Sequence, residues 1–251
     1  MGEKTGIAWT DATWNPVYGC SEVSPGCDNC YAKRDMARFG KPWKLTRAKR
    51  ATFEAPLRWK EPRRVFVCSW GDLFHPLVPQ GWMQEIWDIM LATPQHTYQL
   101  LTKRPGRMAW WAQAHSWRNH IWAGTSIESA KYLPRLDVLE RVPAKIRFAS
   151  LEPLLERLDL RPWLWPRHGG YPVGHVCKGC LTAQPLSWVV AGGESGPNHR
   201  PMQIEWVQDI ADQCTAAHVP LFVKQGGSLR PGQQGDLPDS LWAIKEMPRE
   251  N

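Results

Sequence analysis

The sequence predicts an α/β fold, a partial or full (β/α) barrel of about six to seven parallel strands in a single domain over residues 1–251. Two observations predict it. Short, nearly continuous apolar runs are typical of parallel strands that are covered on both faces. Segments of helical length separate several of these runs, and such alternation favours a βα-repeat sheet. A doubly wound open sheet is the alternative architecture.

Seven strands are expected in chain order. A short opening strand is predicted near residues 6–9. Six apolar runs follow it, and they cover residues 65–69, 97–102, 120–125, 145–150, 187–191 and 219–224. Residues 80–93 and 203–217 repeat apolar side chains with a period near 3.6 and are therefore predicted as amphipathic helices. Cys214 lies on the apolar stripe of the second helix and Cys68 lies in a strand, so both are expected in the core.

One segment interrupts this alternation. Residues 161–186 are rich in proline and glycine, lack periodicity, and are interpreted as an insertion loop between two βα units. The loop contains His168, His175, Cys177 and Cys180, a set of nitrogen and sulfur ligands that suits structural zinc (Zn²⁺). A second cluster site and a loop without a ligand are the alternatives.

Polar, charged or glycine residues follow nearly every predicted strand. In a βα barrel the carboxyl ends of the strands meet on one face, where ligand-binding and catalytic groups gather. Some of these residues could instead cap helices. The set comprises Gly71, Asp72, Lys103, Arg104, Ser126, Glu128, Glu152, Gly192, Gly193, Glu194, Lys224, Gln225 and Gly226.

Charge is unevenly distributed along the chain. The net charge is +7, yet residues 31–64 contain twelve Lys and Arg against three acidic residues, a net charge of +9. This excess indicates an anionic partner, such as a nucleic acid or nucleotide, although a solvated basic helix is the simpler alternative. The sequence contains no apolar run long enough to cross a membrane and no signal-peptide core at its start, so a cytoplasmic location is expected.

Three of the seven cysteines, Cys20, Cys27 and Cys30, lie within eleven residues in the spacing C-x6-C-x2-C. Reducing conditions inside cells argue against disulfides. Structural zinc takes four ligands, and no fourth ligand lies nearby in the sequence. Three thiolates leave one iron of a [4Fe–4S] cluster open, so the spacing favours a cluster with an exchangeable position. Small apolar fillers are the remaining alternative.

Six segments of the sequence resemble those of a known family. The stretches WTDATWNPVYGCSEVSPGCDNCYA, VFVCSWGDLFH, YQLLTKRP, SLEPLL, VVAGGESGP and FVKQGG are similar, in the same order, to blocks of the phage-associated three-Cys-motif (phage Gp37/Gp68-type) family. A three-cysteine loop after the first strand of a βα barrel also resembles the radical S-adenosylmethionine enzymes. Those enzymes usually have the spacing C-x3-C-x2-C, with an aromatic residue just before the last cysteine. Here Tyr31 follows Cys30.

The resemblance implies a [4Fe–4S] cluster on Cys20, Cys27 and Cys30, with S-adenosyl-L-methionine on the fourth iron. A 5′-deoxyadenosyl radical would then abstract hydrogen from the substrate, with electrons from a flavodoxin- or ferredoxin-like donor. Gly71 and Asp72 occupy the place where such enzymes hold the methionyl amine. Other expected cofactor contacts are Tyr31, Ser69, Ser126, Glu128, Glu152, Gly192 and Gly193. The expected catalytic set is Asp72, Lys103, Glu152, Glu194 and Lys224.

The function expected from the sequence is therefore a radical S-adenosylmethionine enzyme that modifies a nucleobase or nucleoside, with hypermodified phage DNA as one candidate substrate. If the chain is phage-encoded, the expected location is the cytoplasm of the host cell. Isomerisation or group transfer would follow hydrogen abstraction. One alternative is the same chemistry on a small molecule or peptide. Another is a metal-stabilised nucleic-acid-binding protein without catalysis.

Overall fold

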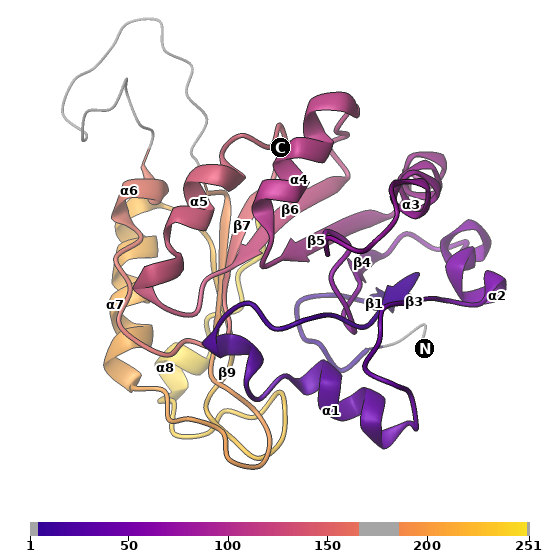
Figure 1. The fold of residues 1–251 in the computed structure, drawn as a ribbon. Coiled ribbons are helices and arrows are strands. Elements are labelled where there is room, and N and C mark those ends of the chain that lie inside the picture. Colours follow the sequence, from indigo (N-terminus) through magenta and orange to yellow (C-terminus); the bar gives the residue numbers. More distant parts are fainter. Residues whose placement is uncertain (1–4, 166–185, 250–251) are drawn as a thin grey trace, which may run out of the picture.

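A curled sheet of seven parallel strands forms a half-barrel at the centre of the molecule (Figure 1). This computed structural model describes residues 5–165 and 186–249. The seven strands are β1 (Ala12–Trp14), β4 (Arg64–Val67), β5 (Thr97–Thr102), β6 (Ile121–Ser126), β7 (Arg147–Leu151), β8 (Trp188–Gly192) and β9 (Leu221–Gln225). A separate antiparallel pair joins β2 (Val17–Tyr18) to β3 (Thr46–Arg47).

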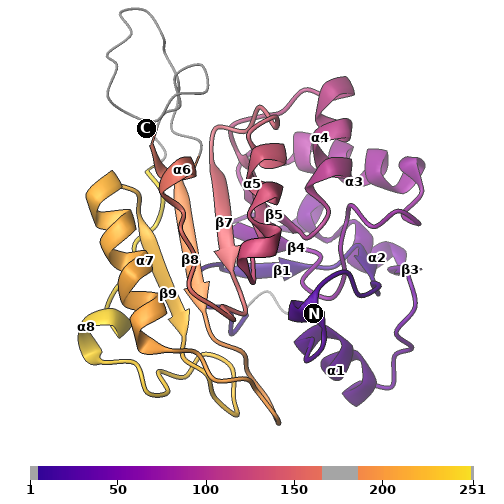
Figure 2. The same ribbon diagram turned by 60° about the vertical axis from the view of Figure 1, so that its left-hand side comes forward.

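Helices flank the outer face of the half-barrel (Figure 2). The helices of the described residues are α1 (Tyr31–Arg38), α2 (Arg50–Phe53), α3 (Gln80–Ala92), α4 (Pro105–Ala114), α5 (Pro134–Leu139), α6 (Arg161–Leu164), α7 (Ile204–Ala217) and α8 (Asp239–Trp242). Helix α1 differs from the others because it lies below the carboxyl ends of the strands in both views. None of the helices in the described ranges combines the length and apolar character that crossing a lipid bilayer requires.

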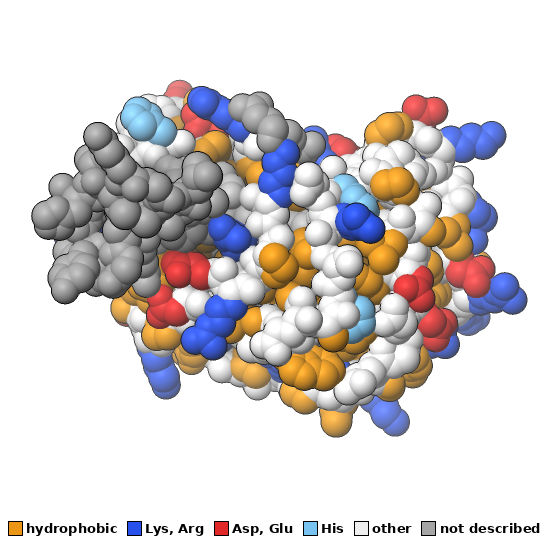
Figure 3. Space-filling model, turned by 90° about the horizontal axis from the view of Figure 1, so that it is seen from above, with side chains coloured by type: hydrophobic (Ala, Val, Ile, Leu, Met, Phe, Trp, Pro, Cys, Tyr) orange, Lys and Arg blue, Asp and Glu red, His pale blue; other side chains and the backbone are white. Residues whose placement is uncertain are grey.

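The strands follow one another across the sheet in the order β1-β4-β5-β6-β7-β8-β9. Every ladder is parallel. A doubly wound sheet would reverse its strand order partway, and this order never reverses. The partial (β/α) barrel is therefore confirmed. All carboxyl ends of the strands face the same way, and Figure 3 shows the opposite end, where Lys and Arg side chains are dispersed among acidic ones.

The predicted position of the opening strand was wrong. Strand β1 begins at Ala12, not near residue 6, and pairs with β4 through Ala12 and Val65. Trp9 precedes the strand and is buried at 1% exposure against aromatic residues of the inner sheet face. Residues 6–9 are therefore apolar because they fill the inside of the half-barrel, and they do not form a strand.

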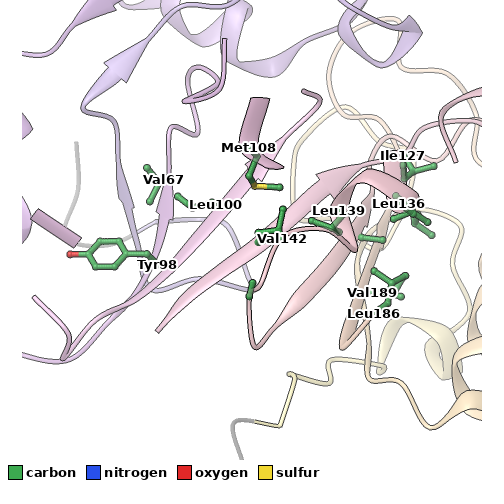
Figure 4. Close-up of a cluster of buried hydrophobic side chains, with 14 of the residues drawn as sticks. Val67, Tyr98, Leu100, Met108, Ile127, Leu136, Leu139, Val142, Leu186 and Val189 are labelled. Carbon is green, nitrogen blue, oxygen red and sulfur yellow. The ribbon is translucent and has the colours of Figure 1, made fainter. Parts of the chain in front are cut away.

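The larger core lies between the outer face of the sheet and its helices. Figure 4 shows Val67, Leu100 and Val189 of the strands facing Met108 of α4 and Leu136 of α5. Cys214 of α7 is buried in the same core, as predicted. Burial of this apolar surface is the main stabilising contribution to the fold.

Aromatic side chains fill the inner face of the half-barrel. Trp188 packs against Trp9, Trp122 and Phe148, with ring centroids between 5.4 and 6.0 Å apart. Gly124 of β6 makes room for this layer, because a Cβ atom there would lie 2.3 Å from Cζ of Phe148. The inner face thus carries a packed layer, and Trp9 and Phe66 of this layer also line the cavity described below.

The expected insertion loop begins differently from the prediction. Its first residues form helix α6, in which Trp163 is buried and donates a hydrogen bond from Nε1 to Asp137 Oδ1 at 2.9 Å. The apolar pair Trp163 and Leu164 explains this, because it joins the outer core. The zinc candidates His168, His175, Cys177 and Cys180 lie outside the described residues.

Candidate functional site

A cavity of about 870 Å³ opens at the carboxyl ends of the strands. Its size falls near the upper end of the ~300–1,000 Å³ that is usual for small-molecule sites. Segments that follow β1, β4, β5, β7, β8 and β9 contribute to its wall, together with the loop between β2 and α1. This is the face of a βα barrel on which ligand sites are found.

The three cysteines Cys20, Cys27 and Cys30 all line this cavity. Cys20 follows β2, Cys27 ends a short 3₁₀ turn, and Cys30 precedes the first turn of α1. All three are free thiols. Within the described ranges, no three His, Cys, Asp or Glu side chains converge as ligands of one metal ion. Cysteine thiolates are the donor type that iron–sulfur clusters take, and all three of these cysteines line the same cavity.

The start of this cysteine loop is fixed by a close backbone approach. Gly19 adopts φ of +89°, and a Cβ atom there would lie 2.3 Å from the carbonyl oxygen of Lys44. Its N–H donates to the Trp70 carbonyl at 2.8 Å, and Gly19 pairs with Gly71 in an isolated parallel bridge. Gly71 is confined in turn, because its own Cβ would lie 3.1 Å from the Gly19 carbonyl oxygen. The predicted residue Gly71 therefore anchors the loop to the end of β4.

Arg104 joins the predicted residue Asp72 to the cysteine loop. Its Nη1 donates to Asp72 Oδ2 at 2.9 Å and to Cys20 Sγ at 3.3 Å, while Nη2 donates to the Ser21 carbonyl at 2.8 Å. Asp72 also accepts hydrogen bonds from Thr102 Oγ1 at 2.7 Å and from the Phe74 N–H at 2.9 Å. Both oxygens of the Asp72 carboxylate are thus already engaged.

Burial and the neighbouring charges determine the pKa of the Cys20 thiol. Burial and then the neighbouring Asp72 carboxylate raise the pKa of the Cys20 thiol, and Arg104 opposes them only in part. Burial likewise raises the pKa of Cys68, which follows β4. Cys68 lies in the core, as predicted, and it also lines the cavity, which was not predicted. Without a cationic ligand, both sulfurs therefore carry protons at neutral pH.

His75 also contacts the cysteine loop. Its Nε2 lies 2.8 Å from Ser21 Oγ, and its Nδ1 accepts a hydrogen bond from the Leu77 N–H at 3.2 Å. Nε2 therefore carries the proton of the neutral ring and donates it to Ser21. Burial and then Arg104 lower the pKa of His75, which keeps the ring neutral at physiological pH.

Glu194 closes the other side of the cysteine loop. It accepts hydrogen bonds from Asn29 Nδ2 at 2.8 Å and from Arg200 Nη2 at 2.6 Å. Arg200 also donates to the Pro25 carbonyl at 2.7 Å and pairs with Asp28. Burial alone would raise the pKa of Glu194, but the hydrogen bonds from Arg200 and Asn29 outweigh it and lower the pKa. Glu194 is thus a charged clamp on the segment that contains Cys27 and Cys30.

Glu152 and Lys224 form an ion pair on the cavity wall, one at the end of β7 and one within β9. Ser150 Oγ donates to the second carboxylate oxygen of Glu152 at 3.2 Å. The two side chains retain 14% and 17% exposure, so both charges remain open to a ligand. Among the predicted residues, Glu152 and Lys224 form the oppositely charged pair that is most accessible from the cavity.

Two of the expected catalytic and cofactor-binding residues do not line the cavity, and neither does Gly226 of the set that follows the strands. Glu128 is fully buried beneath the cysteine loop, where it pairs with Arg135 at 2.9 Å and lies 3.8 Å from Lys103 Nζ. Its Oε1 has no hydrogen-bond donor among the described residues. Gly192 is buried in β8, beside the side chains of Glu152 and Gln225.

Most of the predicted contacts do meet at the cavity. Tyr31 donates from its hydroxyl to the Ser69 carbonyl at 2.8 Å. A Cβ atom on Gly193 would lie 2.5 Å from the Gly227 nitrogen, so this glycine permits close backbone packing. The predicted residues on the cavity wall are Cys20, Cys27, Cys30, Tyr31, Ser69, Gly71, Asp72, Lys103, Arg104, Ser126, Glu152, Gly193, Glu194, Lys224 and Gln225.

Sequence reasoning missed two residues that position the cysteine loop, Asn29 and Arg200, and it gave no role to Arg104, which it placed among the residues that follow the strands. Arg104 directly follows the predicted residue Lys103 at the end of β5, so its position after a strand was a usable signal. Asn29 and Arg200 gave none, because Asn29 bonds to Glu194 across 165 residues of sequence and Arg200 bonds to Asp28 across 172.

Comparisons with known proteins identify one related group. Residues 4–243 match the model of a family described as proteins of unknown function, DUF5131. No curated protein matches the chain, and no solved structure matches it.

Proposed function

The chain belongs to the DUF5131 family, whose function is unknown, and we propose from its site that it is a radical S-adenosylmethionine enzyme. In this proposal Cys20, Cys27 and Cys30 hold a [4Fe–4S] cluster, and the cavity binds S-adenosylmethionine and a substrate. The observation that carries the proposal is the location of all three thiols on the wall of one large cavity at the carboxyl end of a half-barrel. Chemistry on this fold takes place at that end.

When bound, the cluster would supply one-electron reductive chemistry to S-adenosylmethionine, with the electron coming from an external reductant, and so enable hydrogen abstraction from a substrate. The protein contributes binding, orientation and protection of that chemistry. Two clamps support this role, since Arg104 ties Cys20 to Asp72, and Arg200 with Glu194 ties the turn before Cys27 to the loop after β8. A loop fixed at both ends holds its thiols in place at low entropic cost.

We assign Asp72 to positioning the loop, because its oxygens already accept hydrogen bonds from Thr102, Phe74 and Arg104. The charged amino-acid end of S-adenosylmethionine needs a carboxylate for its amine and a cation for its carboxylate. Glu152 and Lys224 provide these two charges on the cavity wall. Charge-assisted hydrogen bonds of this kind are about twice as strong as neutral ones.

A non-catalytic, metal-stabilised nucleic-acid-binding protein is the competing function. Such a protein has no need for charged pairs along the inside of a cavity, where desolvation makes them expensive to maintain. The Asp72–Arg104 and Glu152–Lys224 pairs, each at 17% exposure or less, therefore favour an enzyme.

The proposed function is tested by product formation. Anaerobically reconstituted protein, given dithionite and S-adenosylmethionine, is expected to release 5′-deoxyadenosine, measured by liquid chromatography and mass spectrometry. Glu152→Gln should reduce the yield at limiting S-adenosylmethionine, because the amine loses its charged partner. Glu205→Gln, on an exposed position of α7, is the matched control and should match the unmodified protein. Iron-loaded protein that releases no 5′-deoxyadenosine with any reductant would refute the proposal.

A further inference from the structure

The cavity has aromatic and aliphatic side chains that the proposed cofactor chemistry does not use. Phe39, at the end of α1, is 60% exposed, and Leu229, in the loop after β9, is 69% exposed, yet both line the cavity. Trp43 and Trp70 line the same cavity and are half-buried. The rings of Phe39 and Trp70 lie 5.6 Å apart at 33°. Such apolar groups exposed around a cavity indicate a ligand that covers them.

Two arginines belong to the same exposed part of the cavity wall. Arg38 of α1 and Arg230 of the loop after β9 are both exposed and both line the cavity. Neither side chain forms an ion pair within the described ranges, whereas Arg104 on the same cavity pairs with Asp72. We call Arg38, Phe39, Trp43, Trp70, Leu229 and Arg230 the cavity rim.

Positive charge continues from the rim along the chain. Lys41 lies over the ring of Trp70 with its Nζ 5.2 Å from the centroid, and Lys44 is exposed three residues further on. Both belong to residues 31–64, whose net charge is +9.

Flat aromatic surfaces next to unpaired arginines match the chemistry of a nucleotide. Bases stack on aromatic side chains irrespective of their identity, and arginines bind phosphates bidentately. A base paired inside a duplex could not reach a cavity at the end of a sheet unless it left the stack. The basic side chains from the rim to Lys44 are more numerous than the binding of one phosphate group requires.

We propose that the cavity rim binds single-stranded nucleic acid, with a base on the Phe39 and Trp70 rings and backbone phosphates on Arg38 and Arg230. This inference rests on the proposed function, because it names the class of substrate that would enter the same cavity. Binding itself needs no cofactor, so the rim can be tested on protein that carries no cluster.

The test is fluorescence anisotropy of a labelled 12-nucleotide single-stranded DNA with the cofactor-free, full-length protein at several salt concentrations. Phe39→Ala is expected to weaken binding about 5- to 100-fold, the range for loss of one base–aromatic stack. Arg38→Ala with Arg230→Ala should weaken it further and reduce the slope of log K against log salt by about 1.4, the value for two lost phosphate contacts on a single strand.

Matched controls separate the rim from overall charge and apolarity. Arg118→Ala with Arg141→Ala also removes two positive charges, but from exposed positions outside the cavity. Leu77→Ala removes an apolar side chain that is 72% exposed and also lies outside the cavity. Both should bind DNA like the unmodified protein. Equal losses in the rim and control variants would overturn the proposal.

Competitors distinguish the sources of the nucleotide chemistry. Adenosine monophosphate should compete at least about 100-fold more weakly than the unlabelled strand, because it offers one phosphate where the strand offers several. Competition by the mononucleotide as strong as by the strand would overturn polymer binding in favour of a free nucleotide. Absence of DNA binding together with 5′-deoxyadenosine release would refute the rim alone, whereas DNA binding without that release would refute the proposed function alone.

Discussion

Cys27→Ala is expected to abolish iron loading of the reconstituted protein. Cys27 is the most buried of the three clustered cysteines, at 9% exposure, and it lines the cavity together with Cys20 and Cys30. Iron–sulfur clusters are held by cysteine thiolates, so two remaining thiols cannot complete a three-thiolate site. Iron and acid-labile sulfide, together with the visible absorption after anaerobic reconstitution, measure the loss.

The matched control for this variant is Cys214→Ala. Cys214 is also a buried free thiol, but it lies in the apolar core on α7 and does not line the cavity. Its variant should keep iron and colour. Iron content in Cys27→Ala equal to that of the control would show that the cysteine loop holds no cluster.

Arg104→Met is expected to lower the free energy of unfolding by about 3–5 kcal/mol, the usual cost of leaving one partner of a buried ion pair uncompensated. The Arg104 and Asp72 side chains are only 11% and 7% exposed, and their atoms lie 2.9 Å apart. The substitution also removes the hydrogen bonds to Cys20 and Ser21. Urea unfolding followed by circular dichroism gives the free energy.

An exposed ion pair provides the comparison. Arg157 pairs with Asp209 at 3.0 Å, but its side chain is 72% exposed, so Arg157→Met should cost at most about 1 kcal/mol. Adding Asp72→Asn to Arg104→Met removes the buried charge and should restore part of the stability. A loss in Arg104→Met no greater than in Arg157→Met would mean that the clamp contributes little to the fold.

The sequence predicted the sheet well because its strands are covered on both faces. The run at 97–102 coincides with β5, and the other five long runs overlap the observed strands closely. Continuous burial leaves a continuous apolar signal, which β6 shows with all six residues buried. The first strand lacks this signal, since β1 has only three residues and the apolar stretch before it fills the inside of the half-barrel.

The site was predictable in outline because polar residues after parallel strands must meet at one edge. Their partners were not predictable. Arg200 reaches Asp28 across 172 residues of sequence, and only the folded chain brings these two segments together. Likewise, no local pattern shows that Glu128 is buried beneath the cysteine loop while Glu152, which also follows a strand, lies on the cavity wall.

Electron paramagnetic resonance of the reduced, iron-loaded protein before and after addition of S-adenosylmethionine tests the central claim most directly. A cluster on Cys20, Cys27 and Cys30 has one iron without a protein ligand, so binding of S-adenosylmethionine there should change the spectrum. Cys27→Ala should give no cluster signal in either condition. Identical spectra with and without S-adenosylmethionine, or zinc in place of iron on the three cysteines, would contradict the proposed enzyme.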